Sequence, residues 1–349
     1  MARVLIITRG DFTNHWQGRF RRLVQVVDLY AGLGLQCDLL SVRPASGSAR
    51  HSASMRAGVL PDIRQAAVLE GDMNDELLHS PVGPLAKTVR AMAGSASYQV
   101  VHLDGMAARA VICPDSILVR DLDGRDGSVA RMPGVDLVLA PTEPMRRRAG
   151  PGALRLPPAV ARSDALPGTM IGWPDIGDSG LADDWNRFLK ALSWRTGDFT
   201  QNLLLSGPAS ERCTPPPTLL RRTLLKRDGT LSEVTGALGL GVFPRDTLDG
   251  DNAAVTHLLS QNCPILIHST AAEAFEGRWA LPTAESFEEL SDLIVGWANG
   301  SLRPHLQETL LRTADAFQDD VFSMTLYVGE RLYKLLEWEW VTDDFAAAV

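Results

Sequence analysis

The chain has 349 residues, of which 45% are hydrophobic, and a formal net charge of -8. This length exceeds that of one ordinary domain and predicts two, each with enough apolar residues for a packed core. The negative charge excludes a general basic surface for nucleic acid, and no apolar run is long enough to span a bilayer.

The amino terminus and the cysteines both indicate a cytoplasmic protein. MARVLIITRG passes directly from a short apolar run into patterned sequence, which is typical of a buried first strand and not of a signal peptide. The four cysteines are dispersed and form no CxxC pair, so they indicate small hydrophobes in a reducing compartment and not a zinc site. They are Cys37, Cys113, Cys213 and Cys263.

The first part of the chain alternates strands and helices. A β-rich run at 3–7, apolar residues at helical spacing over 20–30 and a second run at 37–42 predict a βαβ unit, whose strands are parallel. The unpatterned segment 43–56 predicts a loop. Further strands are expected at 66–69, 98–103, 116–120 and 135–140, with a helix at 85–92 and a short basic helix capped by Thr142.

Residues 149–168 are rich in glycine and proline and predict a domain boundary. The alternation then restarts. Strands are expected at 170–173, 202–206, 240–244 and 264–267, and helices at 185–192, 231–238, 253–260, 287–297, 304–317 and 322–340. Ser286 is the expected N-cap of the helix at 287–297. An apolar and basic stretch ending at Lys226 follows a proline-rich linker and is assigned no element.

Two alternating blocks joined by a hinge predict an α/β protein with two doubly wound, Rossmann-like domains. Ligands of such sheets bind beyond the carboxyl ends of the strands, so the expected site is a cleft between the domains. We expect an N-terminal domain at 1–158, a C-terminal domain at 159–320 and, at 321–349, a helix that crosses back to the first domain. Trp338 and Trp340 would pack that helix against the first domain.

Several segments resemble glycosyltransferase family 4, a group of retaining enzymes with the GT-B fold. The loop Arg9-Gly10-Asp11-Phe12 stands where the family has a glycine-rich loop before its first helix. The strand at 100–104 resembles the family's strand that ends in a histidine-rich turn. Further similar segments are 136–145, 156–160 and 281–290. The resemblance implies a GT-B fold with a donor-binding second domain and an acceptor-binding first domain.

The most informative window is 242–267. The family places two glutamates eight positions apart before a proline and a strand, and these positions fall on Asp249 and His257, with Gly250 matching a glycine after the first. In the family the first carboxylate accepts a bond from a sugar hydroxyl and the second binds the ribose diol. Asp249 can keep the first role, but a histidine cannot accept two bonds from a diol.

The family also has a basic pair in its second domain that neutralises the leaving diphosphate. After Gly172 this chain has the acidic segment 174–178 instead. The nearest basic candidates are Lys190, Arg212, Arg221 and Arg222.

In the first domain, His102, Asp104 and Asp121 lie at predicted carboxyl ends of strands, where they either contact a ligand or serve as a buried histidine and loop caps. Arg9 is either a residue of the cleft floor or a solvated loop cation. The run 146–148 of three arginines is either a solvated helix face or a contact with anionic lipid.

These observations lead to one main hypothesis. The protein transfers a sugar from a nucleotide diphosphate sugar to a glycan, lipid-linked or protein acceptor with retention, without a metal or other cofactor, in bacterial surface polysaccharide synthesis. The assigned catalytic residues are His102, Asp121 and Asp249; the donor-binding residues are Gly172, Asp249, Gly250 and His257; the acceptor-side residues are Arg9, Gly10 and Asp104.

Two alternatives stay open. The chain could be a catalytically inactive relative that serves as a partner or scaffold of an active transferase, or another GT-B enzyme such as a sugar epimerase. The expected location is the cytoplasm, with possible peripheral contact at the inner face of the membrane, and nucleic acid is not an expected partner.

Overall fold

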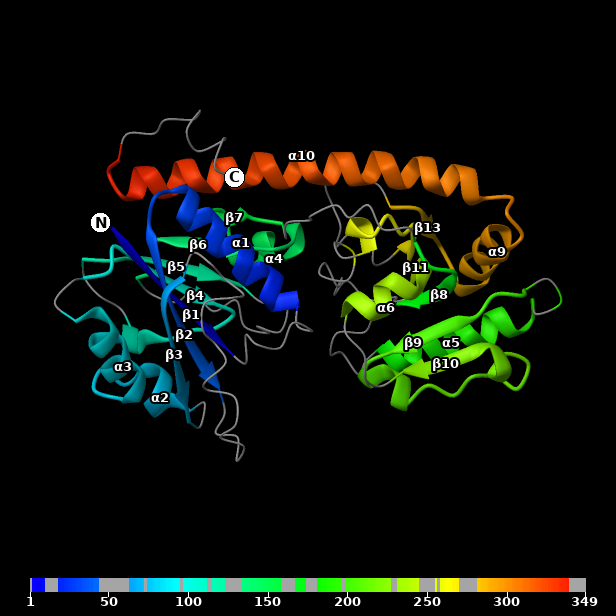
Figure 1. Ribbon diagram of the computed structural model, residues 1–349, viewed down its shortest axis with the longest axis horizontal. Helices are drawn as coiled ribbons and strands as arrows, with labels where there is room; N and C mark the ends of the chain where they lie inside the picture. The colour runs from blue at the N-terminus through cyan, green and yellow to red at the C-terminus, as the bar shows by residue number, and fades with distance from the viewer. Residues whose placement is uncertain are drawn as a thin grey trace. The chain divides into compact units, whose positions relative to one another are not determined.

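The computed structural model describes most of the chain (Figure 1). The described residues are 2–9, 18–43, 63–71, 74–94, 97–111, 115–122, 134–157, 167–173, 181–195, 197, 199–226, 231–244, 255, 258–269 and 281–338. The chain divides into two compact units. The first comprises Met1–Asn14, Arg19–Pro157 and Val321–Val349, and the second comprises His15–Gly18 and Pro158–Asp320.

The first unit contains a seven-stranded sheet in the order β3-β2-β1-β4-β5-β6-β7. Every pairing in it is parallel. The strands are β1 (Arg3–Arg9), β2 (Gln36–Arg43), β3 (Ile63–Glu70), β4 (Val100–Asp104), β5 (Ile117–Asp121), β6 (Leu137–Ala140) and β7 (Ala153–Arg155). This order reverses between β1 and β4, as in the doubly wound Rossmann fold.

Helices of the first unit cover both faces of this sheet. They are α1 (Gly18–Gly32), α2 (Asp75–His79), α3 (Pro84–Ala93), α4 (Glu143–Ala149), a short turn of 3-10 helix at Arg109–Val111, and the end of α10 (Arg303–Leu335). One face packs Val4 and Ile6 against Tyr30 of α1 and Val328 of α10. The alternate residues Leu5 and Ile7 pack on the other face with α2 and α3. Strands buried on both faces explain the unbroken apolar runs in the sequence.

The second unit repeats this topology with a six-stranded parallel sheet in the order β10-β9-β8-β11-β12-β13. Its strands are β8 (Met170–Trp173), β9 (Leu203–Ser206), β10 (Thr223–Lys226), β11 (Leu238–Phe243), β12 (Ile265–His268) and β13 (Thr283–Ala284). The order reverses between β8 and β11, the same place in the fold as in the first sheet. The prediction of two Rossmann-like α/β halves is therefore confirmed.

The second unit also contains α5 (Leu181–Ser193), α6 (Leu231–Ala237), α9 (Phe287–Ala298), the start of α10 and two turns of 3-10 helix, Pro208–Glu211 and Leu220–Arg222. Trp185 and Phe188 of α5 are fully buried and meet edge to face, with ring centroids 5.5 Å apart. Apolar residues at this spacing predicted the helix, because positions three apart share one face.

Two predicted helix starts are confirmed. The Thr142 hydroxyl accepts a bond from the Met145 amide at the start of α4. The Ser286 hydroxyl accepts one from the Glu289 amide at the start of α9. Each satisfies a backbone donor that the first turn of a helix leaves without a partner.

Three predictions differ from the structure. Leu238 was expected to be helical, but α6 ends at Ala237 and Leu238 begins β11. The helices expected at 304–317 and 322–340 are one helix, α10, because residues 318–321 contain no proline or glycine that would end it. The short strands β7 and β10 fall in segments to which no strand was assigned.

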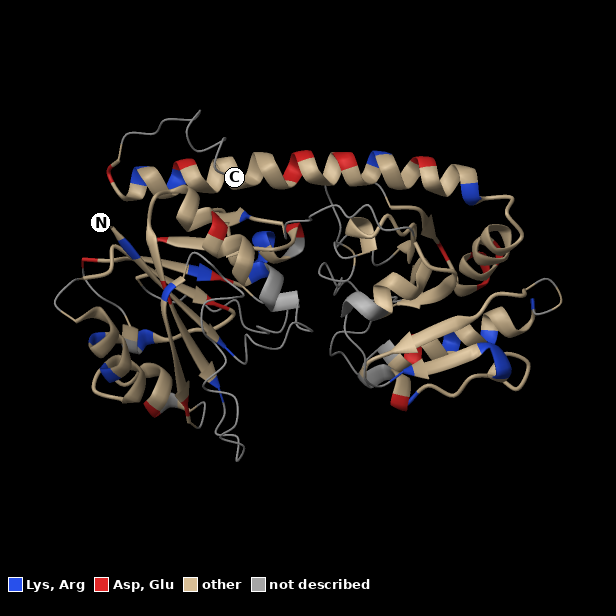
Figure 2. Cartoon of the chain, in the orientation of Figure 1, with Lys and Arg blue, Asp and Glu red and all other residues tan. Residues whose placement is uncertain are grey.

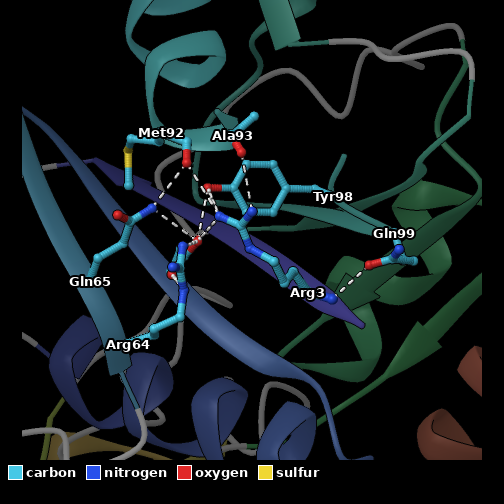
Figure 3. A network of polar contacts seen from close by, with 8 residues as sticks. Arg3, Arg64, Gln65, Met92, Ala93, Tyr98 and Gln99 are labelled. Atoms are coloured by element: carbon cyan, nitrogen blue, oxygen red, sulfur yellow. Dashed lines mark hydrogen bonds and ion pairs between the residues drawn. The ribbon is translucent and has the colours of Figure 1, made fainter. Parts of the chain in front are cut away.

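A buried ionic network joins the amino ends of the first four strands (Figure 3). Asp38 is fully buried and accepts bonds at 2.6 Å from both Arg3 and Arg64, and at 2.9 Å from the Tyr98 hydroxyl. Burial raises the pKa of Asp38, but the hydrogen bonds outweigh it and hold the pKa below its usual value. Arg3 also donates to the carbonyls of Met92 and Ala93 at the end of α3, where helix carbonyls need donors.

Candidate functional site

Polar side chains form a row across the carboxyl ends of three neighbouring strands in the first unit. Thr8 pairs in register with Asp104, and Asp104 with Asp121. The Thr8 hydroxyl donates to the Asp104 carboxylate at 2.6 Å. Both aspartates are buried, at 4% and 1% relative exposure. The structure thus brings together two predicted site residues beside β1 and β4, the strands between which the sheet order reverses.

Arg22 of α1, which the sequence did not single out, holds Asp121 in place. Its guanidinium donates to the two carboxylate oxygens at 2.6 and 2.9 Å. It also donates to the Leu156 carbonyl at 2.5 Å, and its neighbour Gln25 donates to the Pro157 carbonyl at 2.8 Å. A bidentate bond between buried ions fixes the carboxylate in one orientation. An arginine with no motif around it gave no signal in the sequence.

His102 lies beneath this row on the same face of the sheet and is fully buried. Its Nδ1 lies 2.9 Å from the Tyr30 hydroxyl, and its Nε2 lies 3.9 Å from Asp121. Burial lowers the pKa of His102 to about 4, despite the opposing effect of Asp121, so the ring is neutral. These contacts are those of a core histidine, and its catalytic role stays a prediction that the burial does not favour.

The predicted acceptor-side residues occupy different surroundings. Asp104 lies in the buried row, whereas Arg9 is exposed at the last position of β1. Arg9 therefore lies at the carboxyl edge where a ligand of this fold is expected. Gly10 follows it and lies outside the described residues.

In the second unit, aromatic rings occupy the corresponding reversal of the strand order. Trp173 ends β8 and Phe243 ends β11, and their ring centroids are 4.6 Å apart. Both are fully buried, and the Trp173 indole nitrogen has no hydrogen-bond partner among the described residues. Ser206 at the end of β9 donates to the Trp173 carbonyl at 3.2 Å. These residues lie beneath the carboxyl edge of the sheet. The sequence did not indicate them as site residues, because apolar residues in a strand usually belong to the core.

Gly172, a predicted donor-binding residue, has a structural reason to be glycine. A Cβ at this position would lie 2.0 Å from the Leu204 carbonyl oxygen of β9. No side chain fits at that distance, so close approach of β8 and β9 requires glycine here. Its role toward a donor stays a prediction.

Asp249, Gly250 and His257 lie outside the described residues, so their assigned roles also stay predictions. Among the basic candidates, Arg221 and Arg222 precede β10, and therefore lie at the amino edge of a parallel sheet, opposite the expected ligand edge. Arg212 follows β9 and its 3-10 turn and lies on the carboxyl side.

Within the described residues, no group of three or more histidine, cysteine, aspartate or glutamate side chains could hold a metal ion. In the same part of the chain, no helix is long and apolar enough to cross a membrane. Cys37, Cys213 and Cys263 are buried, as expected of small core residues, and Cys113 lies outside the described ranges.

No described protein family and no curated protein matches the sequence. Solved structures do match over nearly the whole chain. They are GT-B proteins with two Rossmann-like domains, and the topology of both sheets agrees with theirs. The chain has the GT-B fold.

Three of the matching structures show the range of proteins that share this GT-B fold. An Anabaena protein solved with UDP and glucose is 12% identical, with a TM-score of 0.59, over 96% of this chain and 100% of that one. Sucrose-phosphate synthase from Thermosynechococcus elongatus is 13% identical, with a TM-score of 0.57, over 96% and 100%. A putative UDP-N-acetylglucosamine 2-epimerase from Listeria monocytogenes is 12% identical, with a TM-score of 0.57, over 97% and 98%.

Proposed function

We propose that the protein is a glycosyltransferase that moves a sugar from a nucleoside diphosphate sugar to a glycan, lipid-linked or protein acceptor. The observation that supports this most is the GT-B fold over 96% of the chain, shared with structures that include one solved with UDP and glucose. In this proposal the second unit binds the donor and the first binds the acceptor. Transfer occurs with retention and without a metal.

The described residues support distinct parts for the two units. In the second, the carboxyl edge around β8 and β11 offers an aromatic floor of Trp173 and Phe243, beyond which the donor would lie. In the first, Asp104 lies at the carboxyl edge of the sheet and is held by Thr8, and its carboxylate would accept a bond from an acceptor hydroxyl.

Asp249 and Gly250 would contact the donor sugar, and His257 would lie near its nucleotide, as the family resemblance implies. Substituting alanine for Asp249 should reduce turnover sharply without loss of the fold, because a carboxylate that binds the transferred sugar contributes to transition-state stabilisation. Unchanged turnover would remove Asp249 from the site.

A second candidate is a catalytically inactive GT-B protein that assists an active transferase. The burial of His102 and the bidentate Arg22 contact with Asp121 favour it, since His102 is enclosed beside Tyr30 and both oxygens of Asp121 are bound by Arg22. The acidic segment 174–178, in place of the basic pair of the family, points in the same direction.

Thermal unfolding with UDP, GDP and ADP sugars separates the two candidates. A ligand that binds only the folded protein raises the melting temperature, so the transferase should respond to at least one of these donors. Release of the nucleoside diphosphate in the presence of an acceptor then reports turnover. The absence of any shift at millimolar concentrations would contradict the transferase proposal, whereas a shift without turnover would favour the inactive protein.

A further inference from the structure

The edge strand β10 of the second sheet has an unusual surface. It pairs in parallel with β9, and no described strand lies on its other side. An open strand edge presents backbone donors and acceptors to any chain that comes alongside, and proteins usually protect it.

Leucines are exposed along this edge. Leu224 is 49% exposed and Leu225 is 44% exposed, and Leu220 in the preceding turn is 59% exposed. Successive side chains of a strand point to opposite faces of the sheet, so Leu224 and Leu225 leave apolar surface open on both faces. The two central positions of β10 thus carry apolar side chains, whereas charged side chains commonly occupy the positions of an exposed edge.

The backbone of β10 is available for one further pairing. The Lys226 carbonyl accepts a bond from the Gly207 amide on the β9 side. In a parallel ladder the backbone groups of every second residue point to the same neighbouring strand. Because those of Lys226 point to β9, the amide and carbonyl of Leu225 point away from β9. Among the described residues nothing bonds to them there.

The charged side chains within this stretch of the chain have one sign. Arg221, Arg222 and Lys226 flank the leucines, and residues 219–226 contain no acidic side chain, although the chain as a whole carries a net charge of -8. Pairing of this edge with the same edge of a second copy would bring these cations together, and like charges across a strand pair are destabilising. The charge therefore favours an acidic partner.

We propose that β10 binds an extended acidic segment of a partner protein, which adds to the sheet as a strand. Such a segment would bond to the Leu225 backbone and place its carboxylates near Arg221, Arg222 and Lys226. Its apolar side chains would cover Leu224 on one face of the sheet and Leu225 on the other. A strand that lies alongside can cover both faces, whereas a membrane approaches from one side only. This surface is independent of sugar transfer.

The test measures fluorescence anisotropy of a labelled peptide in which two adjacent valines, one for each face of the sheet, lie between glutamates, titrated with the full chain. Leu225→Pro should weaken binding by at least about tenfold, because it removes the outward amide while leaving the bonds to β9 intact. Leu225→Thr keeps the amide and a β-branched side chain and should bind within about threefold of the wild type. Circular dichroism establishes that both variants fold.

Charge reversal provides a second test that does not depend on proline. The double substitution Arg221→Glu and Arg222→Glu should weaken binding by about tenfold, and the same change at the exposed Arg312 and Arg331 of α10 should have no effect. A matched peptide with lysine in place of glutamate should not bind the wild type.

Three results would overturn the proposal. One is the absence of saturable binding at millimolar peptide. The second is equal binding by the Leu225→Pro variant. The third is a protein that does not bind the peptide but binds phosphatidylserine vesicles, and loses that binding when Arg221 and Arg222 are reversed in charge. This result would assign the edge to anionic lipid.

Discussion

At the scale of single residues, His102 and Asp121 show how burial decides what a strand-end residue can do. Position in the sequence correctly placed both at the carboxyl ends of strands, together with Asp104. It could not indicate that His102 would be enclosed by Tyr30, or that Arg22 would reach Asp121 from α1. Those contacts depend on how a helix lies across the sheet, which apolar spacing alone does not specify.

His102 predicts a defined dependence of stability on pH. The pKa of His102 is about 4 in the folded protein and 6.5 in the unfolded chain. Between these two pH values the unfolded chain binds a proton that the native state does not. Stability is therefore lost as the pH falls from 6.5 to 4, by about 3 kcal/mol in total from this group. His102→Gln should remove that contribution in urea unfolding measured across this range. Parallel pH profiles for the two proteins would contradict the assignment.

Arg22 predicts a large loss of stability on truncation. Arg22→Ala leaves Asp121 charged and buried without its cation, which should cost about 3–5 kcal/mol of unfolding free energy. Arg312→Ala, which breaks an exposed pair with Glu308, should cost less than about 1 kcal/mol. Urea denaturation of the two variants compares these losses of unfolding free energy. Equal losses would show that the ion pair of Arg22 with Asp121 does not stabilise the fold more than an exposed pair does.

At the scale of elements, the strands that carry the site were predictable because both sheets are covered on both faces. β1, β8 and β9 therefore contain continuous apolar runs, and β2 and β4 are apolar runs interrupted by single polar residues. β10 was not predicted, because its leucines and basic residues follow no strand pattern in a segment that begins with prolines. The join within α10 was also missed, since the apolar spacing changes where the helix passes from one unit to the other.

Gly172 yields a prediction about β8. Gly172→Ala should cost about 3 kcal/mol, because the new Cβ would collide with the Leu204 carbonyl of the neighbouring strand. Gly236→Ala in α6 meets no atom within 4 Å and should be neutral or stabilise the protein by about 1 kcal/mol. Thermal unfolding of both variants tests this difference. A Gly172→Ala protein of normal stability would show that the sheet does not require glycine at this position.

At the scale of the whole molecule, the same strand order occurs in both units, and the GT-B assignment rests on the solved structures that match this pair of sheets over nearly the whole chain. Along α10, Asp315, Asp319 and Asp320 follow one another without a basic residue between them, and basic residues lie toward both ends of the helix (Figure 2). The overall negative charge does not mark a partner, and the two carboxyl edges and the β10 edge are the features that point to binding. Sequence reasoning found the first two and missed the third.

Hydrogen–deuterium exchange with and without the nucleoside diphosphate sugar that gives the largest thermal shift tests the central claim most directly. If the second unit binds the donor beyond the reversal of its strand order, protection should appear in the peptides that follow β8 and β11, after Trp173 and Phe243. The first unit should show little change without an acceptor. Protection confined to the carboxyl edge of the first sheet, or no protection in either unit, would contradict the proposed division of roles.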